Sequence, residues 1–259
     1  MVGTIWCPGT RGADLSERDE FLSTVRGALG HFGVGAPEKV PSATALSDDA
    51  IAVELRAQAV LEDAEGRADE LMNALAVSAA TAEWKVARVS SLVEAKQYVV
   101  DLVGSLEARS VVRSAQEVVE KLVLESVLPP LGVALTTMAL DGPDDEPRAN
   151  LRERAIAADL GVTGVDYVIV ETGSCVLLAS EEVSRLVALT PPVHLAIVQR
   201  GQVLPSLDEL FTLRRREALV EETSSYMNII SGPSRSGDID QTIVTGVHGP
   251  CEVHMILLD

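Results

Sequence analysis

The sequence predicts an α/β protein built on a wound sheet, and three observations support that fold class. Segments typical of strands alternate with helical segments through most of the 259-residue chain. Three strand-like runs, at Val165–Val170, His194–Val198 and Val253–Leu258, are almost continuously apolar, as in strands that are buried on both faces. Apolar residues make up 47% of the chain and charged residues 23%, which suits a folded domain with a full core.

The N-terminal part differs from the rest. We expect residues 1–46 to form an N-terminal helical extension and residues 47–259 to form one α/β domain. Within the extension a helix is predicted over Glu17–Leu29, because apolar residues recur there at helical spacing. Gly and Pro residues between Gly30 and Pro41 then predict a loop.

A long Ala-rich helical stretch opens the α/β domain. The acids after Ser47 favour a helix start, and apolar residues recur at helical spacing as far as Val77, with Gly66 as a point of division. One face of its first part is marked by Ile51, Leu55, Ala59 and Glu62. Two interpretations of this stretch stay open: it packs against its own domain, or it faces a partner protein.

The remaining elements follow from periodicity and from Gly and Pro breaks. Strands are predicted at Lys85–Val89, Ser110–Val112, Gly132–Thr136, Val165–Val170, Val176–Ala179, His194–Val198, Asn228–Ser231 and Val253–Leu258. Helices are predicted at Leu92–Leu106, Val118–Leu128, Leu151–Leu160, from Leu207 to about Glu222, and at Ile239–Val247.

The charge balance limits the classes of partner. With 39 acidic and 21 basic residues, the formal net charge is −18, and such a protein repels phosphate backbones and anionic lipid surfaces. Nucleic acid is therefore not expected as a partner. The start of the chain lacks the pattern of a signal peptide, and no apolar run approaches the ~20 residues that span a bilayer. We expect a soluble, cytoplasmic protein without a membrane span.

The cysteines argue against a metal centre in this chain. Cys7, Cys175 and Cys251 are widely separated, odd in number and contain no CxxC pair. This pattern disfavours a disulfide framework, an iron–sulfur cluster and a structural zinc site. We therefore expect no metal and no cofactor here, and we expect Cys175 and Cys251 to be small buried residues of strands.

The first candidate site segment is Glu171-Thr172-Gly173-Ser174, which interrupts two apolar strand-like runs. A carboxylate at the end of a buried strand is costly unless it is paired or functional, and a glycine there permits close backbone approach. Glu171 is therefore a candidate catalytic residue, and Thr172 and Gly173 are candidate ligand-binding residues. The alternative is a solvent-exposed hairpin turn.

The second candidate segment is Ser231–Asp238, between a predicted strand and the predicted helix Ile239–Val247. Backbone N–H groups and the dipole at a helix start favour an anion, and a guanidinium fork suits a carboxylate or phosphate. We predict an anion cradle made of Gly232, Pro233, Ser234, Arg235 and Asp238. The alternative is a well-capped helix start without a ligand.

The third candidate segment is Gly246–Pro250, at the break before the last strand. His248 lies in this corner and is a candidate catalytic residue; the alternative is a hydrogen-bonded structural histidine. A serine hydrolase is disfavoured, because Ser174 and Ser234 lie in no GxSxG elbow.

Taken in order, these segments resemble the lactate-utilisation (LUD) domain family. The resemblance rests on Glu-Thr-Gly-Ser after a buried strand, Pro191-Pro192 with His194 opening the next strand, Ser-Gly-Pro-Ser-Arg-Ser-Gly-Asp-Ile-Asp, and Gly-Val-His-Gly-Pro. It covers roughly Val118–Asp259 and is closest to the stand-alone members of the lactate-utilisation protein C type.

The resemblance implies a fold similar to the ribose-5-phosphate isomerase and CoA-transferase group. It also implies a non-cluster subunit of a cytoplasmic system that oxidises L-lactate to pyruvate, with iron–sulfur clusters in partner proteins. Our leading hypothesis combines this role with the predicted anion cradle: the chain binds an anionic small molecule, and Glu171 and His248 face it. Two alternatives stay open: a free-standing transferase- or isomerase-like enzyme with Glu171 as nucleophile or base, and a ligand-sensing or assembly protein without catalysis. Whether the isolated chain is an enzyme, and whether it forms a homo-oligomer, stay open as well.

Overall fold

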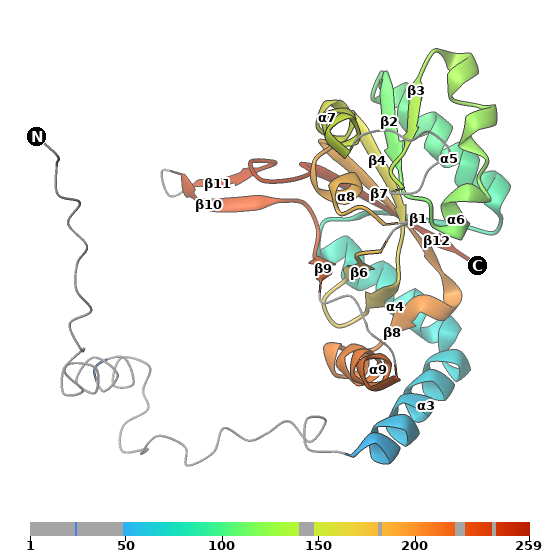
Figure 1. The fold of residues 1–259 in the computed structure, drawn as a ribbon, viewed down its shortest axis with the longest axis vertical. Helices are drawn as coiled ribbons and strands as arrows, with labels where there is room; N and C mark the ends of the chain where they lie inside the picture. The colour runs from blue at the N-terminus through green and yellow to red at the C-terminus, as the bar shows by residue number, and fades with distance from the viewer. Residues whose placement is uncertain (1–23, 25–48, 140–147, 181–182, 221–225, 240–241) are drawn as a thin grey trace, which may run out of the picture. The chain divides into compact units, whose positions relative to one another are not determined.

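The structure is a computed structural model that describes Thr24 and residues 49–139, 148–180, 183–220, 226–239 and 242–259 (Figure 1). Apart from Thr24, the predicted extension over residues 1–46, with its helix Glu17–Leu29, lies outside the described residues. In the part of the chain that is described, no helix has both the length and the apolar character that crossing a membrane requires.

Helices and strands alternate along most of the described chain. The helices are α3 Ala50–Gly66, α4 Ala68–Thr81, α5 Leu92–Ser105, α6 Glu117–Glu120, α7 Arg148–Ala157, α8 Leu186–Leu189 and α9 Leu207–Val220, with short 3-10 turns η1 Leu124–Ser126, η2 Pro129–Leu131 and η3 Arg200–Gln202. The strands are β1 Lys85–Val89, β2 Ser110–Arg113, β3 Ala134–Thr137, β4 Leu160–Gly164, β5 Tyr167–Ile169, β6 Ser174–Leu178, β7 Val193–Gln199, β8 Val203–Leu204, β9 Met227–Ile230, β10 Arg235–Ile239, β11 Thr242–Thr245 and β12 Glu252–Leu258.

A six-stranded sheet forms the centre of the fold, in the order β1-β12-β7-β4-β2-β3 (Figure 1). Every neighbouring pair in it is parallel. Parallel strands need crossover connections, which the intervening helices and the second sheet supply. The predicted α/β class is therefore confirmed, while the likeness to the isomerase and CoA-transferase group stays a prediction.

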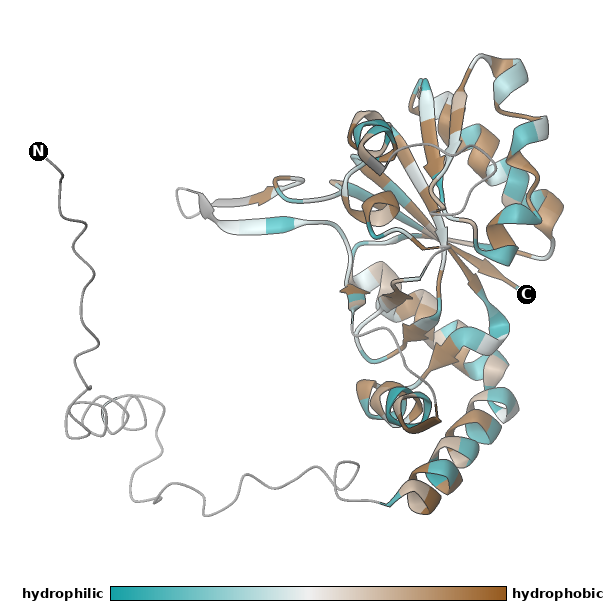
Figure 2. Ribbon diagram, in the orientation of Figure 1, coloured by the Kyte–Doolittle hydropathy of each residue, from teal (hydrophilic) through white to brown (hydrophobic). Residues whose placement is uncertain are grey.

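Successive residues of the central strands enter two different cores. In β12, Met255 and Leu257 belong to the cluster that contains α4, whereas Ile256 and Leu258 belong to the cluster that contains α5. Both faces of the sheet are therefore covered, and this explains why these strands are continuously apolar in the sequence (Figure 2).

A second, four-stranded sheet in the order β8-β5-β6-β9 packs into the same cluster as α4 and α9. Its presence divides the sequence differently from the prediction. The predicted helix Leu151–Leu160 ends at Ala157, and Gly161 belongs to β4 instead of closing the helix. A Cβ atom at Gly161 would lie 1.8 Å from the carbonyl oxygen of Val187, so the glycine allows α8 to approach the sheet.

The predicted helix Ile239–Val247 is wrong, because β10 and β11 form an antiparallel hairpin that is a separate two-stranded sheet. The residues of β11 are all β-branched, and such side chains favour strands over helices. The base of the hairpin is closed at Ser234, whose N–H donates to Pro250 O (2.8 Å) and whose carbonyl accepts from Gly246 N–H (2.9 Å).

Helix α3 buries a different face from the one that its sequence suggested. Val53, Ala57 and Ala64 are buried, whereas Ile51 and Leu55 are 74% and 64% exposed. The packed face is the one with small and β-branched residues, because α3 lies against α9.

Candidate functional site

The candidate site is organised around the C-terminal end of α4. The helix ends at Thr81, and the chain turns through Glu83 in the left-handed region (φ 67°). The N–H of Trp84 then donates to Ala79 O (3.0 Å), and the chain continues into β1. The last carbonyl groups of α4 therefore face the segments that reach this end of the helix.

The Glu171–Ser174 segment is the turn between β5 and β6, whose antiparallel register pairs Ile169 with Ser174. Gly173 has a φ of 61°, and a Cβ atom there would lie 2.6 Å from the carbonyl oxygen of Ser78. The alternative of a hairpin turn is thus the correct local geometry, and the turn rests directly on α4. Glu171 and Thr172 are exposed, whereas Ser174 is fully buried.

The Ser231–Arg235 segment links β9 to β10 and contacts the same helix end. Gly232 has a φ of 86°, and a Cβ atom there would lie 1.9 Å from Ala82 O. Because β10 follows instead of a helix, no helix N-terminus faces a ligand here, and the predicted helix-dipole contribution to the anion cradle is wrong. The remaining cation of that prediction is the Arg235 guanidinium.

Hydroxyl groups join the two segments. Thr172 Oγ1 lies 2.7 Å from Ser174 Oγ, which in turn lies 2.6 Å from Ser231 Oγ. The third segment joins through Ser234, whose Oγ accepts from His248 N–H (3.4 Å). The structure therefore brings together residues that are about 60 positions apart in the chain. We call Glu171–Ser174, Ser231–Arg235 and His248 the motif site.

The other predicted site residues can now be placed. Arg235 forms an ion pair with Glu83 (3.1 Å), with side chains 40% and 57% exposed. The side chain of His248 is exposed, and Pro233 is partly buried within its segment. Asp238 lies further along β10, so its backbone is not part of the junction at the end of α4. The motif site thus contains every predicted site residue except Asp238, and His248 joins it through its backbone N–H alone.

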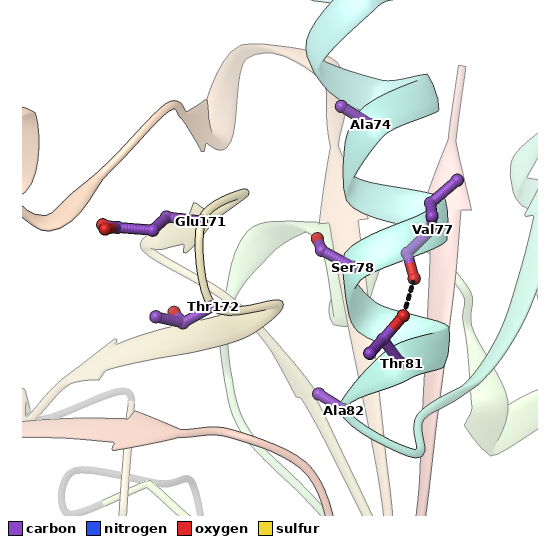
Figure 3. Close-up of a pocket in the computed structure, with 7 residues that line it drawn as sticks. All are labelled: Ala74, Val77, Ser78, Thr81, Ala82, Glu171 and Thr172. Atoms are coloured by element: carbon purple, nitrogen blue, oxygen red, sulfur yellow. Dashed lines mark hydrogen bonds between the residues drawn. The ribbon is translucent and has the colours of Figure 1, made fainter.

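An open groove of about 720 Å³ runs between the β5–β6 turn and α4. It is lined by Ala74, Val77, Ser78, Thr81, Ala82, Glu171 and Thr172 (Figure 3). In Figure 3 the Ser78 side chain points towards the turn, while the carboxylate of Glu171 points away from the helix. The groove therefore presents small and apolar side chains, and Glu171 lies at its rim.

Three buried residues on the α4 face of the central sheet were not assigned to the site by sequence reasoning: Trp84, Thr163 and His194. His194 Nε2 is 2.9 Å from Thr163 Oγ1, and the His194 and Trp84 rings meet edge to face with centroids 6.0 Å apart. Burial, and to a lesser extent the neighbouring His254, lower the pKa of His194 to about 3, so the ring is neutral at physiological pH. The available signal was a histidine inside an apolar run directly after Pro191-Pro192.

A row of hydrogen-bonded polar side chains lies on the other face of the central sheet. Tyr98 of α5 hydrogen-bonds to His254 Nδ1 (2.8 Å), and His254 Nε2 lies 2.7 Å from Glu252 Oε1. Burial lowers the pKa of His254, although Glu252 acts in the opposite direction. Every ring nitrogen of His254 has a partner, which is the arrangement of a structural histidine.

The cysteines differ from each other. Cys175 is buried in β6, as predicted, whereas Cys251 is exposed before β12, so the prediction of a buried Cys251 is wrong. The N–H of Cys251 donates to Pro192 O, which ties it to the entry of β7 and not to the core. Among the described residues, no group of three or more His, Cys, Asp or Glu side chains is placed to hold a metal ion.

The LUD domain model matches residues 72–258, which include all of the motif site. The chain belongs to the LUD domain family. The resemblance on the three motif segments is thereby confirmed, and the match extends through α4 and β1 to the last strand.

Known members and a solved structure show how this LUD domain compares. It is 37% identical over 110 residues to lactate utilization protein C of Halalkalibacterium halodurans, covering 42% of this chain and 48% of that protein. It is 26% identical over 213 residues to lactate utilization protein B of Shouchella clausii, covering 64% and 43%. The chain thus spans about half the length of the curated relatives that it matches. A DUF162 family protein from Deinococcus radiodurans aligns with a TM-score of 0.47 at 17% identity, covering 74% of this chain and 98% of that one.

Proposed function

We propose that this chain is a non-cluster subunit of a cytoplasmic system that oxidises L-lactate to pyruvate, and that its motif site binds a small organic anion. Membership of the LUD domain family and the similarity to lactate utilization proteins C and B support the process. The observation that carries the site is the convergence of two motif segments on the end of α4, with the third segment joined to them through Ser234.

Anion binding in this proposal rests on Arg235. Its guanidinium is held by Glu83, but both side chains are well exposed, and an exposed ion pair contributes little stability. A ligand carboxylate can therefore replace Glu83 at small cost and gain a two-point hydrogen-bonded contact with the planar fork. Glu83 then serves as the resting partner of the guanidinium.

Hydrogen bonds connect the segment that carries Arg235 with the other two motif segments. The Ser234 hydroxyl accepts from the backbone N–H of His248 (3.4 Å), which ties the third segment to it. The Thr172, Ser174 and Ser231 hydroxyls connect this segment to Glu171. In the proposed system this chain binds and orients the anion, and the electrons pass to iron–sulfur proteins that associate with it.

The exposure of Glu171 favours this role over the free-standing enzyme. A carboxylate that acts as nucleophile or base gains its reactivity from a shielded, positioned environment. Glu171 is exposed at the rim of an open groove, and its carboxylate points away from α4 (Figure 3). The ligand-sensing or assembly alternative shares the same geometry and is separated by experiment.

The test is genetic and biochemical. The gene is deleted in the organism that carries it, and growth is measured on L-lactate and on pyruvate as sole carbon sources. We expect loss of growth on lactate alone, restored by the wild-type chain, and co-purification of iron–sulfur proteins with the tagged chain. Equal growth of the deletion strain on both carbon sources contradicts the lactate role. Turnover of lactate or another acid by the isolated chain, without partners, favours the free-standing enzyme.

A further inference from the structure

Two buried ring nitrogens on the α4 face of the central sheet lack a hydrogen-bond partner among the described residues: Trp84 Nε1 and His194 Nδ1. Trp84 is 3% exposed and His194 is fully buried, so water at the surface does not satisfy either atom. A buried polar atom without a partner costs roughly 1–3 kcal/mol. Two such atoms on rings whose centroids are 6.0 Å apart indicate that an additional group belongs between or beside them.

The two rings lie in one row across the sheet. His194 is in register with Val253 of β12 and with Gly161 of β4, and Trp84 precedes Lys85, which pairs with His254. Trp84 and Val253 belong to the core on the α4 side of the sheet. The row is therefore on the face that α4 and the second sheet cover, not on the face of Tyr98 and His254.

The Trp84 end of the row adjoins the part of α4 on which the motif site rests. The backbone N–H of Trp84 donates to Ala79 O, and a Cβ atom on Gly173 would lie 2.8 Å from Ala79 Cα. Glu83, the resting partner of Arg235, is the residue before Trp84. On the His194 side, Pro192 O accepts from Cys251 N–H (2.9 Å), in the segment that follows His248.

We propose that Trp84 and His194 form a buried subsite that binds the oxygen atom on carbon 2 of a small 2-hydroxy or 2-oxo carboxylate. The inference rests on the proposed function in naming this class of ligand, and it places the ligand carboxylate towards Arg235. The indole N–H donates to either a hydroxyl or a carbonyl oxygen. The subsite therefore adds to the motif site a hydrogen-bond donor for the oxygen on carbon 2, the atom that distinguishes these acids from simple carboxylates.

His194 can pair with both oxidation states of such a ligand. Its ring is neutral, so one nitrogen donates and the other accepts. Its Nε2 partner is the Thr163 hydroxyl, which can donate or accept. When Thr163 donates, Nδ1–H is free to donate to a carbonyl oxygen; when Thr163 accepts, Nδ1 accepts from a hydroxyl. The subsite therefore holds a hydroxy acid and the corresponding oxo acid without a charged group.

The test uses Trp84 as its own reporter. The chain contains two tryptophans, so Trp6→Phe leaves Trp84 as the only one. The full-length variant is titrated with L-lactate, with pyruvate, and with acetate, which lacks the oxygen on carbon 2. We expect a saturable change in Trp84 emission with lactate and pyruvate, and binding of acetate at least tenfold weaker.

Two substitutions at His194 separate the two ring nitrogens. His194→Gln places a polar atom near the Nε2 position and keeps the Thr163 contact, whereas His194→Asn places one near Nδ1. We expect Gln to weaken lactate binding about tenfold, which is the loss of one hydrogen bond of ~1.4 kcal/mol, and Asn to retain most of the affinity. Tyr98→Phe, on the other face of the sheet, is the matched control and should bind like wild type.

Three results overturn the subsite: an emission that no probe changes, acetate binding as tightly as lactate, or equal affinities of the two His194 variants and the wild type. A water molecule held permanently between the nitrogens gives the first of these. If the His194 variants do not fold, the comparison of lactate with acetate on the Trp6→Phe chain decides by itself. If the deletion strain loses growth on lactate but no probe changes the Trp84 emission, the subsite is removed and the lactate role stays in place.

Discussion

Replacing Gly232 with alanine tests whether the contact between the Ser231–Arg235 segment and the end of α4 holds the motif site together. At this position the new methyl group would lie 1.9 Å from the carbonyl oxygen of Ala82, and the backbone has a φ of 86°. The oxygen belongs to the main chain, so no side-chain rotation relieves the overlap. Either the segment or the helix end has to move.

The chain offers two controls that separate the causes. Gly132 has nearly the same φ, 82°, with nothing within 4 Å of its added methyl group, and Gly201 has neither feature. A left-handed alanine costs about 1–2 kcal/mol, and forcing a methyl group into packed space costs roughly 1–3 kcal/mol more. We therefore expect destabilisation of about 1–2 kcal/mol for Gly132→Ala, about 2–5 kcal/mol for Gly232→Ala, and less than ~0.5 kcal/mol for Gly201→Ala.

Urea unfolding and thermal melting of the four proteins give these differences, with ~2–4 °C of Tm for each kcal/mol in a chain of this size. Lactate-dependent growth is measured below the Tm of the weakest variant. We expect Gly232→Ala to lose growth on lactate while Gly132→Ala keeps it. If Gly232→Ala is no less stable than Gly132→Ala and supports growth equally well, the contact with Ala82 does not position the site.

Four further predictions follow from the same contacts. Arg235→Ala should weaken binding of lactate and pyruvate, measured by calorimetry, about tenfold to a hundredfold, and Arg235→Lys should recover part of that affinity. Neither variant should change Tm noticeably, because the ion pair with Glu83 is exposed. Equal affinities of the wild type and both variants remove Arg235 from the site. Glu171→Gln should leave Tm unchanged but abolish lactate-dependent growth, and wild-type growth would show that Glu171 is only a turn residue. The pKa of His194 is about 3 in the folded chain and 6.5 ordinarily, so the unfolded state binds the proton first as the pH falls. The stability due to His194 is therefore complete above pH 6.5 and falls by ~1.4 kcal/mol per pH unit below it. Between pH 8 and 5, the free energy of unfolding from urea titrations should depend less steeply on pH in His194→Asn than in the wild type. Burial raises the pKa of the Cys175 thiol to about 12 while Cys251 is exposed, so a Cys7→Ser chain should show one fast-reacting thiol that Cys251→Ser removes; a second fast thiol would mean that β6 is accessible.

The central strands were predictable because their environment is uniform. Residues of β7 and β12 alternate between two apolar cores, so most positions select an apolar side chain and the run stands out without knowledge of its neighbours. Turns are also marked locally: Gly173 and Gly232 both adopt left-handed backbone angles.

The β10–β11 hairpin was not predictable by the same means. Its strands form a sheet of their own, and none of the described core residues belongs to it, so the apolar periodicity on which the helix Ile239–Val247 was predicted carried no burial signal. The pairing of Ser234 with Pro250 and Gly246, which closes the hairpin, joins residues that are up to 16 positions apart. Such pairing is a tertiary contact that local propensity does not encode.

The site, like the fold, was predictable from the sequence only in part. Glu171, Arg235 and His248 were identifiable because polar groups beside glycine interrupt apolar runs. The support beneath them was not, since Gly173 and Gly232 contact the backbone of Ser78, Ala79 and Ala82 at the end of α4, which no residue type reveals. His194 was noticed as the opening of a strand, but its unpartnered nitrogen depends on what Thr163 and Trp84 leave unfilled.

The three hydroxyls that link Thr172, Ser174 and Ser231 give the site a direction as well as a connection. Each hydroxyl has a single proton to donate, so Ser174 can donate to the Thr172 hydroxyl or to the Ser231 hydroxyl but not to both, and when it donates to Ser231 it can only accept from Thr172. Both ends of the row are exposed, whereas its middle member is buried. A hydrogen-bond acceptor that binds at Ser231 takes the proton of the Ser231 hydroxyl in a hydrogen bond, so Ser231 accepts from Ser174 and Ser174 accepts from Thr172. Binding at one loop therefore fixes the direction of the hydrogen bond that Thr172 makes in the other loop, without any movement of the backbone.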